Sequence, residues 1–177
     1  LLINFNMVVI KEYNRPGQLI AVDCIIFGYE AKELKILLFN RKIDPHKGEW
    51  SLLGGWVNKD ETVESAASRV LNQITGLTDI YLEQVHVFSE PSRDSGGRVI
   101  SIAFYALINI GEQNKELVRS HGAKWWSLKE IPQLIFDHKE MVEKALVKLR
   151  ILSSYELQGK HILPKTFTIT QLRSLYN

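Results

Sequence analysis

Cysteine is almost absent from this 177-residue sequence, and so are long apolar runs and a strong net charge. The single Cys24 excludes a disulfide within the chain, and so sparing a use of cysteine is typical of a reducing cytoplasm. A membrane-spanning helix needs about 20 consecutive apolar residues. The apolar opening LLINFNMVVI is shorter than that and lacks the basic start of a signal peptide. The sequence therefore predicts a cytoplasmic protein without a membrane partner.

The net charge of +2 indicates no particular partner, but the charge is unevenly distributed. Residues 141–177 hold six Lys or Arg against two Glu, a net charge of +4, which leaves −2 for residues 1–140. A basic C-terminal part is typical of a protein with a phosphate-bearing partner such as nucleic acid. A solvated helix face gives the same pattern, so charge alone leaves both interpretations open.

Hydrophobic residues make up 45% of the chain, enough for the full core of one domain with a small appendage. Short runs rich in Ile, Leu and Val predict five strands, the first two joined as a hairpin, at residues 18–28, 33–41, 80–88, 98–109 and 123–127. Apolar residues at helical spacing predict two helices, at 61–75, which stops at Gly76, and at 138–151, capped by Asp137. On this pattern Cys24 is a buried strand residue.

The most specific pattern lies in residues 54–77, GGWVNKDETVESAASRVLNQITGL. The Nudix hydrolases carry Gly, a five-residue gap, Glu, a seven-residue gap, and then Arg-Glu-x-x-Glu-Glu-x-Gly. Gly55, Glu61, Arg69 and Gly76 fall in register with this signature, so the chain resembles that family. The resemblance implies an α/β fold of the Nudix type, an α/β/α sandwich with a mixed β-sheet. It also implies that Glu61 braces its loop against Arg69.

Three positions of this box lack the residues that the family uses to bind metal. Where its glutamates stand, the chain has Val70, Gln73 and Ile74. Their i+3 and i+4 spacing places them close together on a helix, where three carboxylates would hold magnesium. Val70 and Ile74 offer no ligand atom and fit an apolar helix stripe, while Gln73 offers one neutral carbonyl. The sequence therefore predicts no catalytic residue, no metal ligand and no cofactor.

Beyond the box, residues 93–108, 123–128 and 134–146 resemble one subgroup, the Nudix-related transcriptional regulators, including their sugar-responsive, L-arabinose branch. In these regulators a Nudix-like domain senses a ligand and a winged-helix domain behind it binds DNA. The segment ILPKTFTITQLRSLYN resembles their junction, with Thr168 and Gln171 as a capping box. The resemblance predicts three parts: an N-terminal extension at 1–17, a Nudix-like ligand-sensing domain at 18–153, and the truncated beginning of a winged helix at 160–177. A helix docked on the core is the alternative for the last part.

Eight polar or aromatic residues are predicted to contact the ligand: Asp23, Arg41, Lys47, Glu49, Trp50, Arg93, Asp94 and Arg98. Asp23 lies inside an apolar strand, where a carboxylate is costly unless paired. Arg41, at the end of the neighbouring strand, is one candidate partner, and the two either grip sugar hydroxyls or form a structural ion pair. Trp50 either stacks on a ligand ring or packs in the core. His138 is expected as a helix-end residue rather than a catalyst.

The resemblance implies ADP-ribose or a pentose such as L-arabinose as effector. Arg93, Arg98 and Lys47 suit a diphosphate, but a pentose needs no charge neutralisation and is the favoured prediction. The sequence thus predicts a ligand-responsive regulator that binds double-stranded DNA as a homodimer. Two alternatives stay open. One is a magnesium-dependent Nudix hydrolase of ADP-ribose or another nucleoside diphosphate derivative, with a metal site rebuilt from Glu61, Glu64 and the 89–98 loop. The other is a binding domain without a DNA role.

Overall fold

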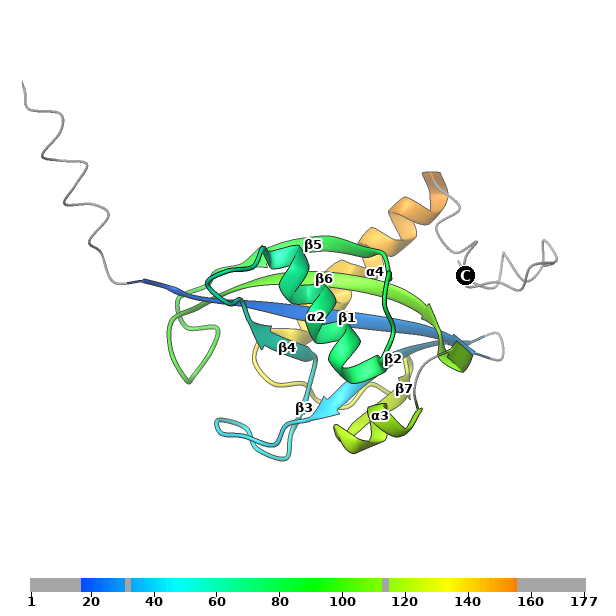
Figure 1. Cartoon of the computed structure of the whole chain (residues 1–177), viewed down its shortest axis with the longest axis horizontal. Coiled ribbons are helices and arrows are strands. Elements are labelled where there is room, and N and C mark those ends of the chain that lie inside the picture. Colours follow the sequence, from blue (N-terminus) through cyan, green and yellow to red (C-terminus); the bar gives the residue numbers. More distant parts are fainter. Residues whose placement is uncertain (1–16, 31–32, 113–114, 156–177) are drawn as a thin grey trace, which may run out of the picture.

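The computed structural model describes residues 17–30, 33–112 and 115–155 (Figure 1). In this part of the chain seven strands form one sheet: β1 (Leu19–Glu30), β2 (Glu33–Asn40), β3 (Trp50–Ser51), β4 (Leu53–Trp56), β5 (Leu82–Phe88), β6 (Val99–Asn109) and β7 (Ala123–Ser127). The helical elements are α2 (Val63–Thr75), the 3-10 turn η1 (Ile110–Glu112), α3 (Lys115–Ser120) and α4 (His138–Tyr155). All five predicted strands and both predicted helices are present, whereas β3, β4, α3 and η1 were not predicted.

The sheet is mixed, and β1 lies at its centre. Its strand order is β3-β2-β1-β6-β5, with β4 paired to β1 and β7 paired to β2. β1 and β6 run parallel, in register from Leu19 opposite Val99 to Tyr29 opposite Asn109. β2 and β4 pair with β1 antiparallel, and β5 pairs with β6 antiparallel. The predicted hairpin of the first two strands is confirmed.

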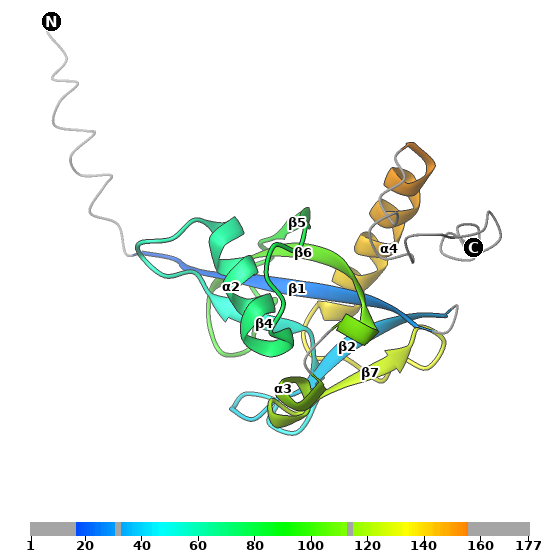
Figure 2. The same cartoon turned by 45° about the vertical axis from the view of Figure 1, so that its right-hand side comes forward.

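Helices cover both faces of the sheet, so the predicted α/β/α sandwich is confirmed. Figures 1 and 2 show α2 on one face and α4 on the other. Alternate residues of β1 point to opposite faces: Val22, Cys24 and Ile26 join the core under α2, and Ile25 and Phe27 join the core under α4. The same alternation turns Asp23 toward the α4 face, which decides its partners.

Local signals fix the ends of the box helix α2. The Thr62 side chain accepts a hydrogen bond from the backbone N–H of Ser65, and Gly76 ends the helix in the left-handed conformation at φ 74°. Cys24 is fully buried as expected, and burial, with a smaller effect of Asp23, raises the pKa of its thiol far above the usual range. Residues 1–16 of the predicted extension and the predicted winged-helix start at 160–177 lie outside the described residues. No helix of the described part is long and apolar enough to cross a membrane.

Candidate functional site

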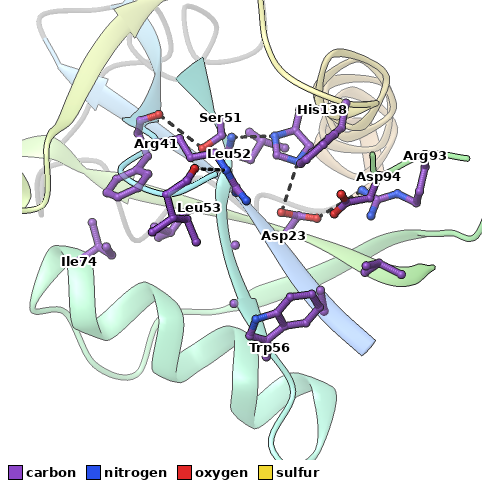
Figure 3. Close-up of a pocket in the computed structure, with 17 residues that line it drawn as sticks. Asp23, Arg41, Ser51, Leu52, Leu53, Trp56, Ile74, Arg93, Asp94 and His138 are labelled. Carbon is purple, nitrogen blue, oxygen red and sulfur yellow. Dashed lines mark hydrogen bonds and ion pairs between the residues drawn. The ribbon is translucent and has the colours of Figure 1, made fainter. Parts of the chain in front are cut away.

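A cavity of about 330 Å³ opens where β1 and β4 meet the start of α4 (Figure 3). Its polar lining residues include Asp23, Arg41, Arg93, Asp94 and His138. Apolar side chains from β2, α2 and the segment before α4 complete the wall. The cavity therefore combines charged groups with apolar surface, as small-molecule sites usually do.

Asp23 lies at the centre of the polar wall and is 6% exposed. Ser101 of β6 donates a hydrogen bond of 2.6 Å to its Oδ2, and Nη2 of Arg93 lies 3.7 Å from the same oxygen. The expected ion pair with Arg41 is wrong, because Arg41 donates through Nε to the backbone carbonyls of Ile43 and Pro45 in its own loop. Both residues still line the cavity. Asp23 is thus held in place by the strand beside it and by the β5–β6 loop.

Arg93 joins the β5–β6 loop to the start of α4. Its Nε and Nη2 donate to the two carboxylate oxygens of Asp137 at 2.8 and 2.7 Å, a bidentate pair. The Arg93 side chain is 3% exposed. Burial alone would lower the pKa of Arg93, but the hydrogen bonds to Asp137 and the charge of Asp23 outweigh it and raise the pKa. Asp137, predicted as a helix cap, therefore binds a buried cation with both of its carboxylate oxygens.

His138, the first residue of α4, lies between the backbone of Leu52 and the carboxylate of Asp23. The backbone N–H of Leu52 donates to its Nδ1 at 3.0 Å, so the ring proton lies on Nε2, 3.6 Å from Oδ1 of Asp23. Burial lowers the pKa of His138 below its ordinary 6.5, and the smaller effect of Asp23 opposes it. The stability that neutral His138 supports is therefore complete above pH 6.5 and is lost as the pH falls toward the lowered pKa.

Within the box, Arg69 makes the bracing contact implied by the resemblance. Its Nε and Nη2 donate to the two carboxylate oxygens of Glu61 at 3.0 and 2.6 Å, and Nη2 also donates to the carbonyl of Trp56. The backbone N–H of Asn58 donates to Glu61 as well. These hydrogen bonds, that of Arg69 first, lower the pKa of Glu61. They hold the loop before α2 against β4.

Two of the three positions where the family has metal-binding glutamates hold buried apolar side chains here. Val70 is 4% exposed and packs against Gly55 of β4, and Ile74, 7% exposed, lines the cavity. Gln73 is exposed. Among the described residues no three His, Cys, Asp or Glu side chains gather closely enough to hold a metal ion. The residues present therefore do not fit a magnesium site.

Restoring the three carboxylates tests this description. We expect the triple variant Val70→Glu, Gln73→Glu, Ile74→Glu to gain saturable magnesium binding, without necessarily gaining hydrolysis. Two of the new glutamates are buried, so they destabilise the fold without metal, and magnesium should raise the melting temperature of this variant alone. Calorimetry and thermal unfolding measure both effects, with Gln73→Glu as the control. Equal magnesium binding by wild type and triple variant would contradict the description.

The cavity brings together half of the eight predicted ligand residues: Asp23, Arg41, Arg93 and Asp94. The other four lie elsewhere. Lys47 is exposed, Glu49 contacts His46 at 3.1 Å, Trp50 packs edge-on against Trp126, and Arg98 donates to the carbonyl of Ser89. For Trp50 the packing interpretation therefore describes the structure.

Trp56, Phe136 and His138 are among the cavity-lining residues that sequence reasoning missed. Trp56, 55% exposed, follows the two glycines of the box, and a large exposed aromatic beside such glycines is a usable signal. The role of His138 has no local signal, because its contact with Leu52 joins residues 86 positions apart. Phe136 likewise enters the cavity only through the position of α4.

The family model described as NUDIX domain matches residues 17–145. The chain is 31% identical over 170 residues to the ADPR responsive transcriptional repressor NtrR of Acinetobacter baylyi, covering 94% of this chain and 68% of that protein. It is 40% identical over 133 residues to the ADP-ribose pyrophosphatase of Methanocaldococcus jannaschii, covering 75% of each. These matches extend over most of the chain.

Solved structures of Shewanella oneidensis NrtR are similar in sequence and fold. One is 30% identical with a TM-score of 0.81, over 90% of this chain and 76% of that one. NrtR with a 27mer DNA is 30% identical with a TM-score of 0.79, over 89% and 74%. Its NUDIX domain with ADP ribose is 28% identical with a TM-score of 0.66, over 81% and 98%. The chain therefore belongs to the Nudix family and, within it, to the Nudix-related transcriptional regulators.

Proposed function

We propose that this chain is the ligand-sensing part of a transcriptional regulator whose Nudix domain binds ADP-ribose without hydrolysing it. One observation carries the proposal: the cavity keeps buried polar side chains around Asp23 and Arg93, while the box helix has the apolar Val70 and Ile74 where two metal-binding glutamates would stand. Such a site binds a ligand by hydrogen bonds and stacking and lacks the carboxylates that would hold a catalytic metal.

The relatives support ADP-ribose as the effector. NtrR is named as ADPR responsive, and the NUDIX domain of Shewanella NrtR was solved with ADP ribose. The pentose favoured from the sequence has no counterpart in these relatives, so ADP-ribose takes its place. In the cavity, the arginines Arg41 and Arg93 suit the diphosphate, and the exposed ring of Trp56 suits the adenine.

The relatives also support a DNA partner. Shewanella NrtR was solved with a 27mer DNA. We propose that the segment at 160–177 begins the winged helix that contacts DNA, and that two copies of the chain bind two half-sites as a homodimer.

Calorimetry on the purified protein tests the effector. ADP-ribose, AMP, ribose 5-phosphate and L-arabinose are titrated separately, first with a chelator and then with magnesium. We expect ADP-ribose to bind without metal and to be recovered intact. Magnesium-dependent breakdown to AMP and ribose 5-phosphate would instead support a hydrolase, an alternative favoured by the 40% identity to an ADP-ribose pyrophosphatase. Binding of L-arabinose alone would overturn ADP-ribose as the effector.

A single substitution tests the placement of the base. We expect Trp56→Ala to weaken the binding of ADP-ribose and AMP at least about fivefold, because stacking on an aromatic ring contributes about 1–3 kcal/mol. The binding of ribose 5-phosphate, which has no base, should be unaffected. Val147→Ala is the matched control, since Val147 is similarly exposed at 53% but lies on α4 outside the cavity. An equal loss for all three ligands would place the base elsewhere.

A further inference from the structure

We infer that the ion pair of Arg93 and Asp137 connects the cavity to α4, and that an anionic ligand group such as a diphosphate acts on α4 by competing for Arg93. This inference rests on the proposed function, because ADP-ribose supplies the anion. It assigns to Arg93 a second role beside ligand contact, and to Asp137 a positioning role.

Arg93 stands between the cavity and Asp137. Arg93 lines the cavity, whereas Asp137 is not one of its lining residues (Figure 3). Asp137 accepts hydrogen bonds from two of the guanidinium nitrogens of Arg93 at 2.7 and 2.8 Å. A ligand in the cavity therefore meets Arg93 directly and reaches Asp137 only through it.

Phosphate and carboxylate groups bind guanidinium in the same bidentate way, so a diphosphate in the cavity competes with Asp137 for Arg93. The Asp137 side chain is 18% exposed and lies at the positive N-terminal end of α4. Leaving its charge unpaired therefore costs less than leaving that of Asp23 unpaired. Asp23, 3.7 Å from Arg93, is 9% exposed at its side chain and keeps its hydrogen bond from Ser101. Of the two carboxylates, Asp137 is thus the one that can release the arginine.

The turn into α4 is held by contacts of three consecutive residues, two of which line the cavity. Phe136 and His138 form part of the cavity wall, and Asp137 holds Arg93. Phe136 has a φ of 50°, in the left-handed region that a phenylalanine adopts only where its surroundings hold it. Its ring packs edge-on against His46 and His138. Loss of the Asp137 contact therefore loosens a turn whose backbone is already unfavourable.

α4 carries such a change away from the cavity. It runs from His138 to Tyr155, and the predicted DNA-binding segment follows it in the sequence. Because a packed helix shifts as one body, a loosened first turn changes the position from which that segment leaves the domain. A ligand in the cavity thus affects DNA binding through α4.

Hydrogen exchange of the α4 amides from Met141 onward tests the inference, with calorimetry in parallel. We expect ADP-ribose to speed exchange in the first turns of α4. Asp137→Asn should speed it without ligand, and ADP-ribose should then add nothing. The same variant should bind ADP-ribose about fivefold tighter or more, because Arg93 is already released. Asp137→Ser, whose side chain is able to cap a helix but cannot hold the guanidinium, should behave alike.

Glu143→Gln is the control, since it removes the same charge from an exposed position of α4. Unchanged or slower α4 exchange in wild-type protein with ADP-ribose bound would overturn the inference, and so would weaker ADP-ribose binding by the Asp137 variants. If titration with ADP-ribose gives no heat of binding, the proposed function is overturned instead. In that case the two Asp137 variants, measured without ligand, still test whether the Arg93–Asp137 pair holds α4. If the α4 amides of both variants exchange at the wild-type rate, the pair does not hold the helix.

Discussion

Replacing Arg93 by methionine is expected to lower the free energy of unfolding by about 3–5 kcal/mol, the cost of breaking a buried ion pair by removing one partner. The substitution keeps much of the side-chain volume but leaves Asp137 and Asp23 without their shared cation. The Arg93 side chain is only 3% exposed, so water cannot replace the guanidinium without opening the loop. Urea unfolding measures the loss as a lower midpoint.

The matched control is Arg98→Met in the same loop. Arg98 is exposed and donates to the carbonyl of Ser89, so we expect a loss below about 1 kcal/mol. Adding Asp137→Asn to Arg93→Met should recover part of the stability, because it removes one unpaired carboxylate. Equal losses for Arg93→Met and Arg98→Met would show that the buried cation does not stabilise the site.

The second large effect is expected at the box glycine. A Cβ at Gly55 would lie 2.6 Å from Cγ2 of Val70, well inside van der Waals contact. Val70 of α2 is 4% exposed, and its β-branched side chain is stiff at χ1. We therefore expect Gly55→Ala to cost about 1–3 kcal/mol, the usual range for overpacking a core.

A double-mutant cycle tests the cause. Val70→Ala removes the methyl group that the new Cβ would meet, so the double variant should lose less stability than the two single variants together. Gly17→Ala is the control, because nothing lies within 4 Å of a Cβ there. Additive losses in the cycle would mean that Gly55 serves another purpose than the close approach of helix and strand.

The sequence predicts most of the fold because each long element carries its own signal. β1, β2 and β6 are dense in Ile, Leu and Val, and α2 has both a capping threonine and a terminal glycine. β3, with two residues, and α3, with six, are too short for apolar periodicity to stand out.

The site was predicted only in part, because its contacts join distant residues. Asp23 stands out as a carboxylate in an apolar strand, but the position of Arg41 at the end of the neighbouring strand suggested it as a partner. The actual partners come from the β5–β6 loop, from β6 and from α4: Arg93, Ser101 and His138. Lys47 and Arg98 have suitable charge and lie near the right loops, but only the folded backbone decides which side chains turn inward.

The parallel pairing of β1 with β6 has a consequence during synthesis of the protein. β1 leaves the ribosome before β6, the strand that pairs with it along its whole length and begins only at Val99. Ser101 of β6, the hydrogen-bond donor to Asp23, lies 78 positions after Asp23. Pairings this distant in sequence form late, because the entropy of closing the intervening loop must be overcome first. The nascent chain therefore carries the apolar strand β1 unpaired on one side until more than half of the domain has been made. Over that interval the unpaired edge of β1 is a site at which aggregation can begin.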